Sequence, residues 1–215
     1  MIHQIAERIT KKIRNKNIIE DQETEIIQYG TEVLLSSMLG IAIILLVSLI
    51  TGYIWHGVIF LILFILIRMY SGGYHADSYV RCNVSFVLTY IMSILLWRLC
   101  LVYHMEWKIW LLTIVGFVLT GHYAPVENHN KCIEESSKII YKKISILIYA
   151  GLMALLLLVD IIGLRYGEYI RLMGKFTNQI DVSLYIKVIL SIIVILMIVG
   201  DWKEKGIVRR QKGER

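Results

Sequence analysis

The sequence predicts an all-α, polytopic membrane protein with six transmembrane helices. Of its 215 residues, 57% are hydrophobic, and the mean hydropathy is +0.63. Only 19% are charged, against about 25% in soluble proteins. The apolar residues gather in long runs divided by short polar segments, which is typical of a membrane bundle and not of a water-soluble core.

Six apolar runs are candidates for the transmembrane helices. They cover residues 33–53, 54–69, 83–103, 107–124, 144–164 and 182–200. Crossing the hydrocarbon takes about 20 residues, with a range of roughly 17–25. The second run is short, so we expect it to tilt little or to continue into the segment after it. We expect one domain over residues 1–215, with the bundle at 31–200 and a basic tail at 201–215.

Residues 1–30 precede the first run and predict an amphipathic helix on the cytosolic side. Lys and Arg cover much of its surface, and apolar residues recur at helical spacing: Ile2, Ile5, Ala6, Ile9 and Ile13. Such a helix either lies in the membrane interface against anionic lipid or packs on the cytosolic end of the bundle, and both interpretations stay open. The polar, basic start predicts no cleavable signal peptide.

The distribution of Lys and Arg sets the expected orientation. If the N-terminus is cytosolic and six spans alternate, 17 of the 23 Lys and Arg residues fall on the cytosolic side. Both termini are therefore expected in the cytosol, together with segments 70–82 and 125–143. The net charge of +6 comes largely from these flanking residues, so no basic face for nucleic acid is expected.

The polar break after the second run holds the candidate chemistry. From Arg68 to Cys82 it reads R-M-Y-S-G-G-Y-H-A-D-S-Y-V-R-C. A cysteine with a histidine is the minimum apparatus for thiol nucleophilic catalysis, in which the histidine accepts the thiol proton and the thiolate attacks a carbonyl. His75 and Cys82 are therefore the candidate catalytic pair.

Neighbouring residues are candidates for supporting roles. Gly72 and Gly73 allow positive φ and close approach of a substrate, and their successive amides are a candidate oxyanion site. Arg68 and Arg81 add positive potential, which favours a thiolate. Three residues are candidates to orient the histidine, and the sequence leaves the choice open: Asp77, Glu127 and Asn128.

Helix geometry constrains the catalytic pair. Positions seven apart on one α-helix share a face but lie about 10.5 Å apart along its axis, beyond hydrogen-bond reach. If the two residues react together, the chain between His75 and Cys82 therefore cannot be one straight helix. We expect a break at Gly72-Gly73, His75 in a loop or re-entrant turn, and Cys82 in the first turn of the third span, where a helix N-terminus favours an anion.

The three cysteines do not predict a disulfide framework. The chain has an odd number of cysteines at irregular spacing, namely Cys82, Cys100 and Cys132. Cytosolic thiols also stay reduced. A zinc site is the competing interpretation, formed by His122, His129 and Cys132 with the candidate catalytic pair. Because the sequence contains no H-E-x-x-H and no paired C-x-x-C, no metal or other cofactor is expected.

The stretch R-x-Y-S-G-G-Y-H-A-x5-C resembles the accessory gene regulator protein B (AgrB) family of Gram-positive bacteria. Glu25–Gly30 resembles the family's segment before its first span, and Tyr123-Ala-Pro resembles the connection after its fourth. The resemblance covers most of the chain, but only the Gly-Gly-x-His-Ala…Cys part is specific. The chain departs from the family at Lys131-Cys132, where Lys-Pro is expected, and this departure concerns the loop conformation and not the chemistry.

The resemblance implies a membrane cysteine endopeptidase that processes the precursor of a cyclic autoinducing peptide. His75 and Cys82 fall on the family's catalytic residues. The thiolate would cut the precursor before its acidic tail and hold the peptide as a thioester, and a precursor Cys or Ser would then close a thiolactone or lactone. The family also implies a homodimer in the cell membrane. A basic loop would suit the acidic tail, although positive-inside charge explains it as well, and its lysines are Lys131, Lys138, Lys142 and Lys143.

Two other classes of function are consistent with the residues alone: a six-span transporter or channel subunit, and a membrane scaffold. A transporter usually carries several ionisable residues near the bilayer midplane. Here the ionisable residues concentrate at span ends and in one predicted cytosolic loop. This distribution favours chemistry at the membrane surface.

Overall fold

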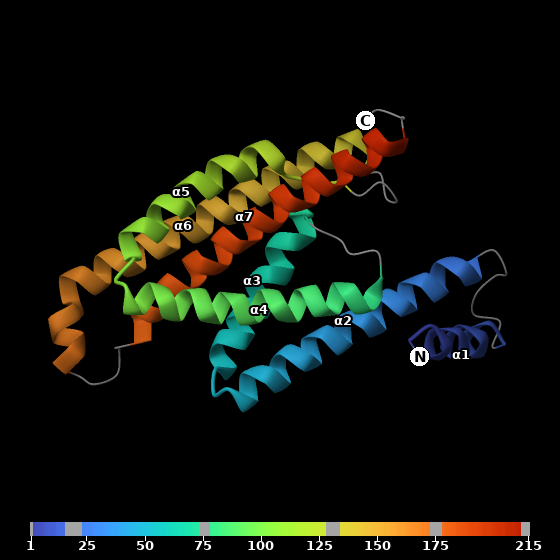
Figure 1. Ribbon diagram of the computed structural model, residues 1–215, viewed down its shortest axis with the longest axis horizontal. Helices are drawn as coiled ribbons and strands as arrows, with labels where there is room; N and C mark the ends of the chain where they lie inside the picture. The colour runs from blue at the N-terminus through green and yellow to red at the C-terminus, as the bar shows by residue number, and fades with distance from the viewer. Residues whose placement is uncertain (1, 16–22, 74–77, 128–133, 173–177, 212–215) are drawn as a thin grey trace. The chain divides into compact units, whose positions relative to one another are not determined.

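The computed structural model describes residues 2–15, 23–73, 78–127, 134–172 and 178–211, with the backbone alone at 164–172, 178–181 and 208–211. The described chain is all-helical, as predicted, apart from turns and one isolated β-bridge. Its helices are α1 (Ile2–Arg14), α2 (Thr24–Ile50), α3 (Ile54–Ser71), α4 (Tyr79–Val102), α5 (Glu106–Tyr123), α6 (Glu135–Leu172) and α7 (Asn178–Gln211) (Figure 1).

Five segments of the described helices are long and apolar enough to cross a membrane. They are α2, α3, α4, Glu135–Gly163 of α6 and Val182–Ile207 of α7. The remaining predicted span, residues 107–124, is a helix as expected, but α5 is not among the five. Its 18 residues include Glu106 and Lys108 in the first turn and His122 in the last, so its apolar core is short.

Helices α6 and α7 are longer than the apolar runs that predicted them. The runs cover 144–164 and 182–200, whereas the added turns at 135–143 and 201–211 are rich in Glu, Lys and Arg. These residues are good helix formers, so the helix continues after the apolar run has ended. Apolar runs indicate which part of a helix suits lipid and not where the helix begins or ends.

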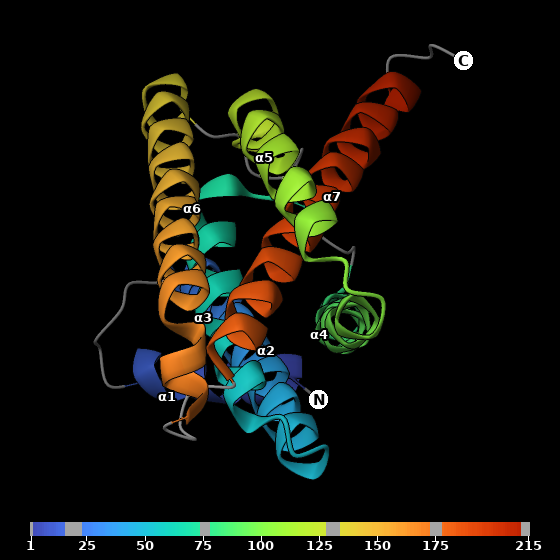
Figure 2. The same ribbon diagram turned by 90° about the vertical axis from the view of Figure 1, so that its left-hand side faces the viewer.

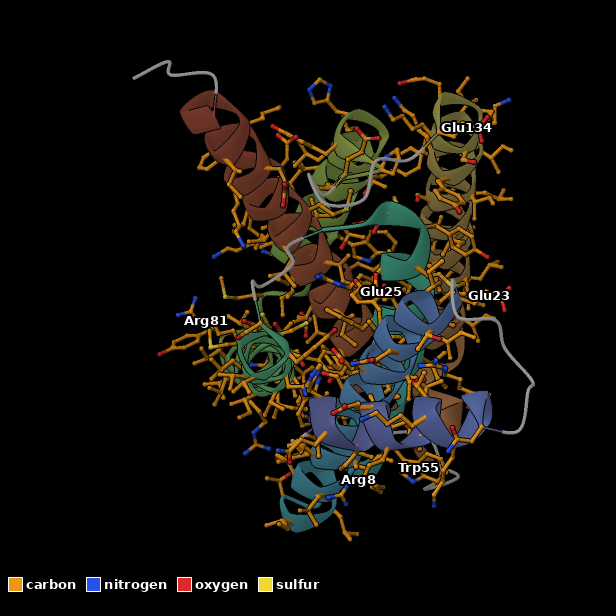
Figure 3. The ribbon with its side chains drawn as sticks, turned by 90° about the vertical axis from the view of Figure 1, so that its right-hand side faces the viewer. Arg8, Glu23, Glu25, Trp55, Arg81 and Glu134 are labelled. Atoms are coloured by element: carbon orange, nitrogen blue, oxygen red, sulfur yellow. The ribbon has the colours of Figure 1, made fainter. Side chains whose placement is uncertain are left out.

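The described chain divides into two compact units. The first comprises residues 1–54 and 76–88, and the second comprises 55–75 and 89–215. In the first unit, α1 packs across α2 (Figure 3). One face of α1 buries small residues, while Ile5 and Ile9 stay 40% and 36% exposed. The structure has an amphipathic helix here, but it is shorter than the predicted 1–30, because it ends at Arg14 and residues 24–30 already belong to α2. It packs on α2 while keeping an apolar stripe open.

Helix α7 is the centre of the second unit. Of its apolar segment 61% is buried, against 17–39% for the other four candidate spans. Helices α5, α6 and α7 pack on one another (Figures 1 and 2). Tyr185 of α7 is fully buried, shares a 3.0 Å hydrogen bond with Ser93 of α4, and meets the His56 and Trp97 rings edge-on. An apolar helix covered on several sides is expected at the core of a bundle.

A buried ion pair joins α5, α6 and α7. Asp160 of α6 pairs with Lys187 of α7, whose side chain is only 3% exposed. The same carboxylate accepts hydrogen bonds from Trp110 Nε1 at 2.7 Å and Ser183 Oγ at 2.5 Å. The Lys187 ammonium also lies 4.6 Å from the Trp110 ring centroid. Ionisable groups persist inside membrane helices when they are paired in this way, so the cluster fixes the arrangement of the three helices.

Removing one member of this pair is expected to destabilise the protein more than removing both. Asp160→Ala leaves a buried ammonium without its carboxylate and should cost about 3–5 kcal/mol of unfolding free energy. The double variant Asp160→Ala/Lys187→Met should recover much of that loss, as measured by SDS-titrated unfolding. The control Lys205→Ala removes a surface pair with Asp201 and should cost at most about 1 kcal/mol. Equal losses for the single and double variants would contradict this role of the pair.

Candidate active site

Helix α3 ends at Ser71, and the two glycines after it turn the chain. Gly72 has φ +68° and Gly73 has φ +135°, a region of backbone conformation that favours glycine because it has no Cβ. The predicted break is therefore confirmed. Helix α4 begins only at Tyr79, so the chain between the candidate catalytic residues is not one straight helix.

Gly72 lies directly against the segment that follows α5. It forms an isolated parallel β-bridge with Val126, whose amide donates to the Ser71 carbonyl at 2.9 Å. A Cβ on Gly72 would stand 2.3 Å from the Val126 carbonyl oxygen, so this close approach requires glycine. The bridge joins the Gly-Gly turn to the Tyr123-Ala-Pro segment, a pairing that neither motif reveals alone.

Arg68 lies beside the same turn. Its guanidinium carbon is 5.3 Å from the Phe64 ring centroid, and its Nη1 is 3.2 Å from where a Cβ of Gly73 would stand. The Gly72 amide donates to the Arg68 carbonyl at 3.1 Å. A side chain at Gly73 would therefore meet the guanidinium, so the Arg68 side chain packs against the turn that follows its helix.

Cys82 lies in the first turn of α4, as predicted. Ser78 precedes the helix, where its hydroxyl accepts from the Arg81 amide at 3.3 Å and its carbonyl accepts from the Cys82 amide at 2.9 Å. This is the geometry of an N-cap serine. The Cys82 side chain is partly exposed, whereas Cys100 further along α4 is buried. Arg81 is exposed and points outward from the helix (Figure 3).

Helix α2 holds the first turns of α4 through residues that sequence analysis missed. The Tyr79 hydroxyl interacts with the Glu32 carboxylate, and Asn83 Nδ2 donates to Ser36 Oγ at 3.2 Å. A Cβ on Gly40 would stand 2.9 Å from Asn83 Oδ1. Glu32, Ser36 and Gly40 recur every fourth position of a mostly apolar helix. Small and polar residues at such spacing mark helix–helix contacts in membranes, and this signal would have found the contact.

Several predicted site residues lie outside the described residues: His75, Asp77, Asn128, His129, Lys131 and Cys132. Among the predicted substrate-tail lysines that the structure describes, Lys138 pairs with Glu127 at 2.9 Å and with Glu135 at 2.6 Å. Lys142 and Lys143 are exposed on α6. Within the described ranges, no three metal-ligating side chains lie together.

Comparison with known proteins identifies the family. The family model described as Accessory gene regulator B (AgrB) matches residues 6–200. The chain belongs to the AgrB family. It is also similar to two proteins of Clostridium perfringens over 143 residues each: 27% identical to AgrB-like protein 2 of strain 13 (type A), and 26% identical to an AgrB-like protein of strain SM101 (type A). Both alignments cover 64% of this chain and 67% of the relative. No solved structure matches the chain at a significant level.

Membership in the AgrB family gives the chain a role in the accessory gene regulator quorum-sensing system. Together with its five apolar helices, it makes the chain a multi-pass protein of the plasma membrane. The resemblance inferred from the Gly-Gly-x-His-Ala…Cys stretch is confirmed, because the matched residues contain that stretch.

An alanine at Gly72 should weaken the pairing with Val126. Gly72→Ala combines the strain of positive φ, about 1–2 kcal/mol, with a clash against the Val126 carbonyl. The Val126 amide should therefore lose its protection from hydrogen exchange. The matched control is Gly52→Ala, because Gly52 has φ +77° and no atom within 4 Å of a Cβ. If Val126 stays equally protected in both variants, the close approach is not what holds the turn.

Proposed function

We propose that the protein is a membrane cysteine endopeptidase with Cys82 as nucleophile and His75 as its base. It removes the C-terminal tail of a peptide precursor and promotes closure of the remaining peptide to a thiolactone or lactone that serves as a quorum-sensing signal. The observation that carries the proposal is the Gly-Gly-x-His-Ala-x5-Cys motif in an AgrB family chain, with its cysteine partly exposed at the capped start of α4.

The proposed reaction passes through a thioester. His75 accepts the Cys82 proton, and the thiolate attacks the carbonyl of the bond before the tail. The tetrahedral oxyanion collapses, the tail amine leaves with the proton from His75, and the peptide stays on Cys82 as a thioester. A Cys or Ser of the precursor then attacks this thioester, closes the ring and releases the enzyme thiol. In the thiolactone case one thioester replaces another, so ring closure needs no cofactor.

The starts and ends of the helices around the break support these roles. The cap at Ser78 places the positive end of the α4 dipole near Cys82, which favours an anion there. The Gly72 amide is already bonded to the Arg68 carbonyl, so the Gly73 amide is the donor that we propose for the oxyanion. The arginine guanidinium beside that glycine adds positive potential to the same place.

Two further roles are part of the proposal. Asp77 and Asn128 are the preferred candidates to orient His75, because the third candidate, Glu127, is paired with Lys138. The acidic tail of the precursor would bind by charge complementarity to lysines of the segment between α5 and α6 and of the α6 start. Lys138 is shared between two carboxylates and is the weaker candidate, so the preferred residues are Lys131, Lys142 and Lys143.

We also propose that α5 is the sixth span, that both termini and the active site are cytosolic, and that the chain acts as one AgrB domain in a homodimer. The bias of Lys and Arg supports the orientation. With 18 residues, α5 is about 27 Å long, close to the hydrocarbon thickness of about 30 Å. The homodimer rests on the family resemblance alone.

A transporter is the second candidate function, because Asp160 and Lys187 are ionisable groups inside membrane helices. Both groups are already paired, and Trp110 and Ser183 bind the same carboxylate. These contacts are explained by a structural role in holding α5, α6 and α7 together, without a transported ion. Peptide processing therefore remains the function that we propose.

The catalytic assignment predicts that Cys82→Ala and His75→Ala each abolish cleavage of a co-expressed precursor. Cys100→Ala and Cys132→Ala should leave cleavage largely intact, because neither thiol has a role in the proposed reaction. An immunoblot that separates the precursor from its shortened product measures all four variants. Product formed by the Cys82→Ala variant would sink the assignment.

The proposed topology predicts which side of the membrane each turn faces. In a cysteine-free background, Thr51→Cys in the turn between α2 and α3 should react with a membrane-impermeant maleimide on intact cells. Glu134→Cys, just before α6, should react only after permeabilisation. Both positions are exposed. Labelling of Glu134→Cys on intact cells would mean that α5 does not cross the bilayer.

A further inference from the structure

Two polar contacts between α2 and α4 flank the proposed nucleophile. Tyr79 lies three positions before Cys82, and its hydroxyl interacts with the Glu32 carboxylate. Asn83 follows Cys82 directly and donates to Ser36 Oγ at 3.2 Å. All these residues belong to the first compact unit. The turn that carries the thiol is thus held on both sides by α2.

Glu32 does more than bind Tyr79. Its Oε1 lies 2.6 Å from Nδ1 of His3 on α1 and 3.5 Å from Nε2 of Gln28 on its own helix. The Glu32 side chain is only 12% exposed, although His3 is 67% exposed. One carboxylate therefore links α1, α2 and the first turn of α4.

Polar contacts of this kind decide how a membrane helix is rotated. Lipid tails are as apolar as leucine, so apolar contact alone does little to fix the rotation or register of one membrane helix on another. Hydrogen bonds and close contacts at small residues do fix them. Ser36 is 5% exposed and Gly40 is buried, and a Cβ on Gly40 would stand 2.9 Å from Asn83 Oδ1, so side chains of α4 pack directly on α2 at this point.

We propose that Glu32 is a positioning residue for the Cys82 nucleophile, acting through Tyr79, with Ser36 supporting it through Asn83. Glu32 does not touch the substrate. It holds the first turn of α4 in the rotation from which the thiol can reach its base and the scissile carbonyl. This inference rests on the proposed cysteine endopeptidase function.

The first test separates positioning from binding. Glu32→Ala should lower kcat for precursor cleavage by about 10- to 100-fold, the size expected when a reacting group is slightly misplaced, with KM changed less than about threefold. Glu32→Gln should restore most of kcat, because its carbonyl oxygen still accepts from the Tyr79 hydroxyl. The matched control is Glu7→Gln, which removes the exposed carboxylate that pairs with Lys11 on α1 and should leave kcat unchanged.

A second series tests the route of the effect. Tyr79→Phe removes only the hydroxyl and should lower kcat by a factor close to that of Glu32→Ala. The double variant Glu32→Ala/Tyr79→Phe should lose no more kcat than either single variant, because both substitutions remove the same contact. Ser36→Ala should lower kcat more weakly. Its neighbour Ser37, which is exposed and bonds only to its own helix in the described contacts, supplies the control Ser37→Ala.

Labelling of the thiol gives an independent readout. Iodoacetamide labels Cys82 alone in a background with Cys100→Ala and Cys132→Ala. In that background, the labelling rate of the protein with His75 is compared with the rate of its His75→Ala form. The difference between the two rates measures contact of the thiol with its base. Glu32→Ala should reduce this difference, and Glu32→Gln should largely keep it.

The outcomes distinguish this inference from the proposed function. Wild-type kcat in both Glu32→Ala and Tyr79→Phe, or an equal loss in Glu32→Gln and Glu32→Ala, would overturn the positioning role. If Glu32→Ala fails to accumulate in the membrane, Tyr79→Phe decides, since it changes a single oxygen. Cleavage by Cys82→Ala would overturn the endopeptidase itself, whatever the Glu32 variants do.

Discussion

The break between α3 and α4 is the constraint on which the rest of the site depends. Two residues seven positions apart on one helix cannot react together, because about 10.5 Å of helix axis separates them. The chain meets this constraint by ending α3 at two glycines with positive φ and by starting α4 at a capping serine. Cys82 consequently lies in the first turn of its helix and not in the middle of it. The proposed chemistry requires this placement, because a nucleophile at a helix start is open to a peptide at the membrane surface.

Polar contacts organise both compact units. The Asp160–Lys187 pair fixes three helices of the second unit, and Glu32 fixes three helices of the first. The backbone bridge between Gly72 and Val126 holds the turn after α3. Lipid competes with protein for apolar side chains, so a membrane bundle needs hydrogen bonds and close contacts at small residues to define one arrangement. The apolar residues decide that the chain enters the membrane, and the few polar residues decide how its helices meet.

Sequence analysis predicted the features that depend on neighbouring residues. The apolar runs, the break at Gly72-Gly73 and the place of Cys82 in its helix all follow from local composition and helix geometry. The bridge between Gly72 and Val126 joins residues that are 54 positions apart in the sequence, and Ser36 and Asn83 are 47 positions apart. Local periodicity does not name such partners. The ends of α6 and α7 were missed for another reason, since polar helix formers extend both helices beyond their apolar runs.

The central claim is that Cys82 carries the peptide as a thioester during processing. The most direct test is intact-protein mass spectrometry of the purified enzyme, quenched in acid soon after it is mixed with the precursor. The account predicts a protein whose mass is increased by the peptide without its tail. Fragmentation should place the added mass on Cys82, and neutral hydroxylamine should remove it. Cleavage with no such adduct, or with the adduct on Cys100 or Cys132, would contradict the account.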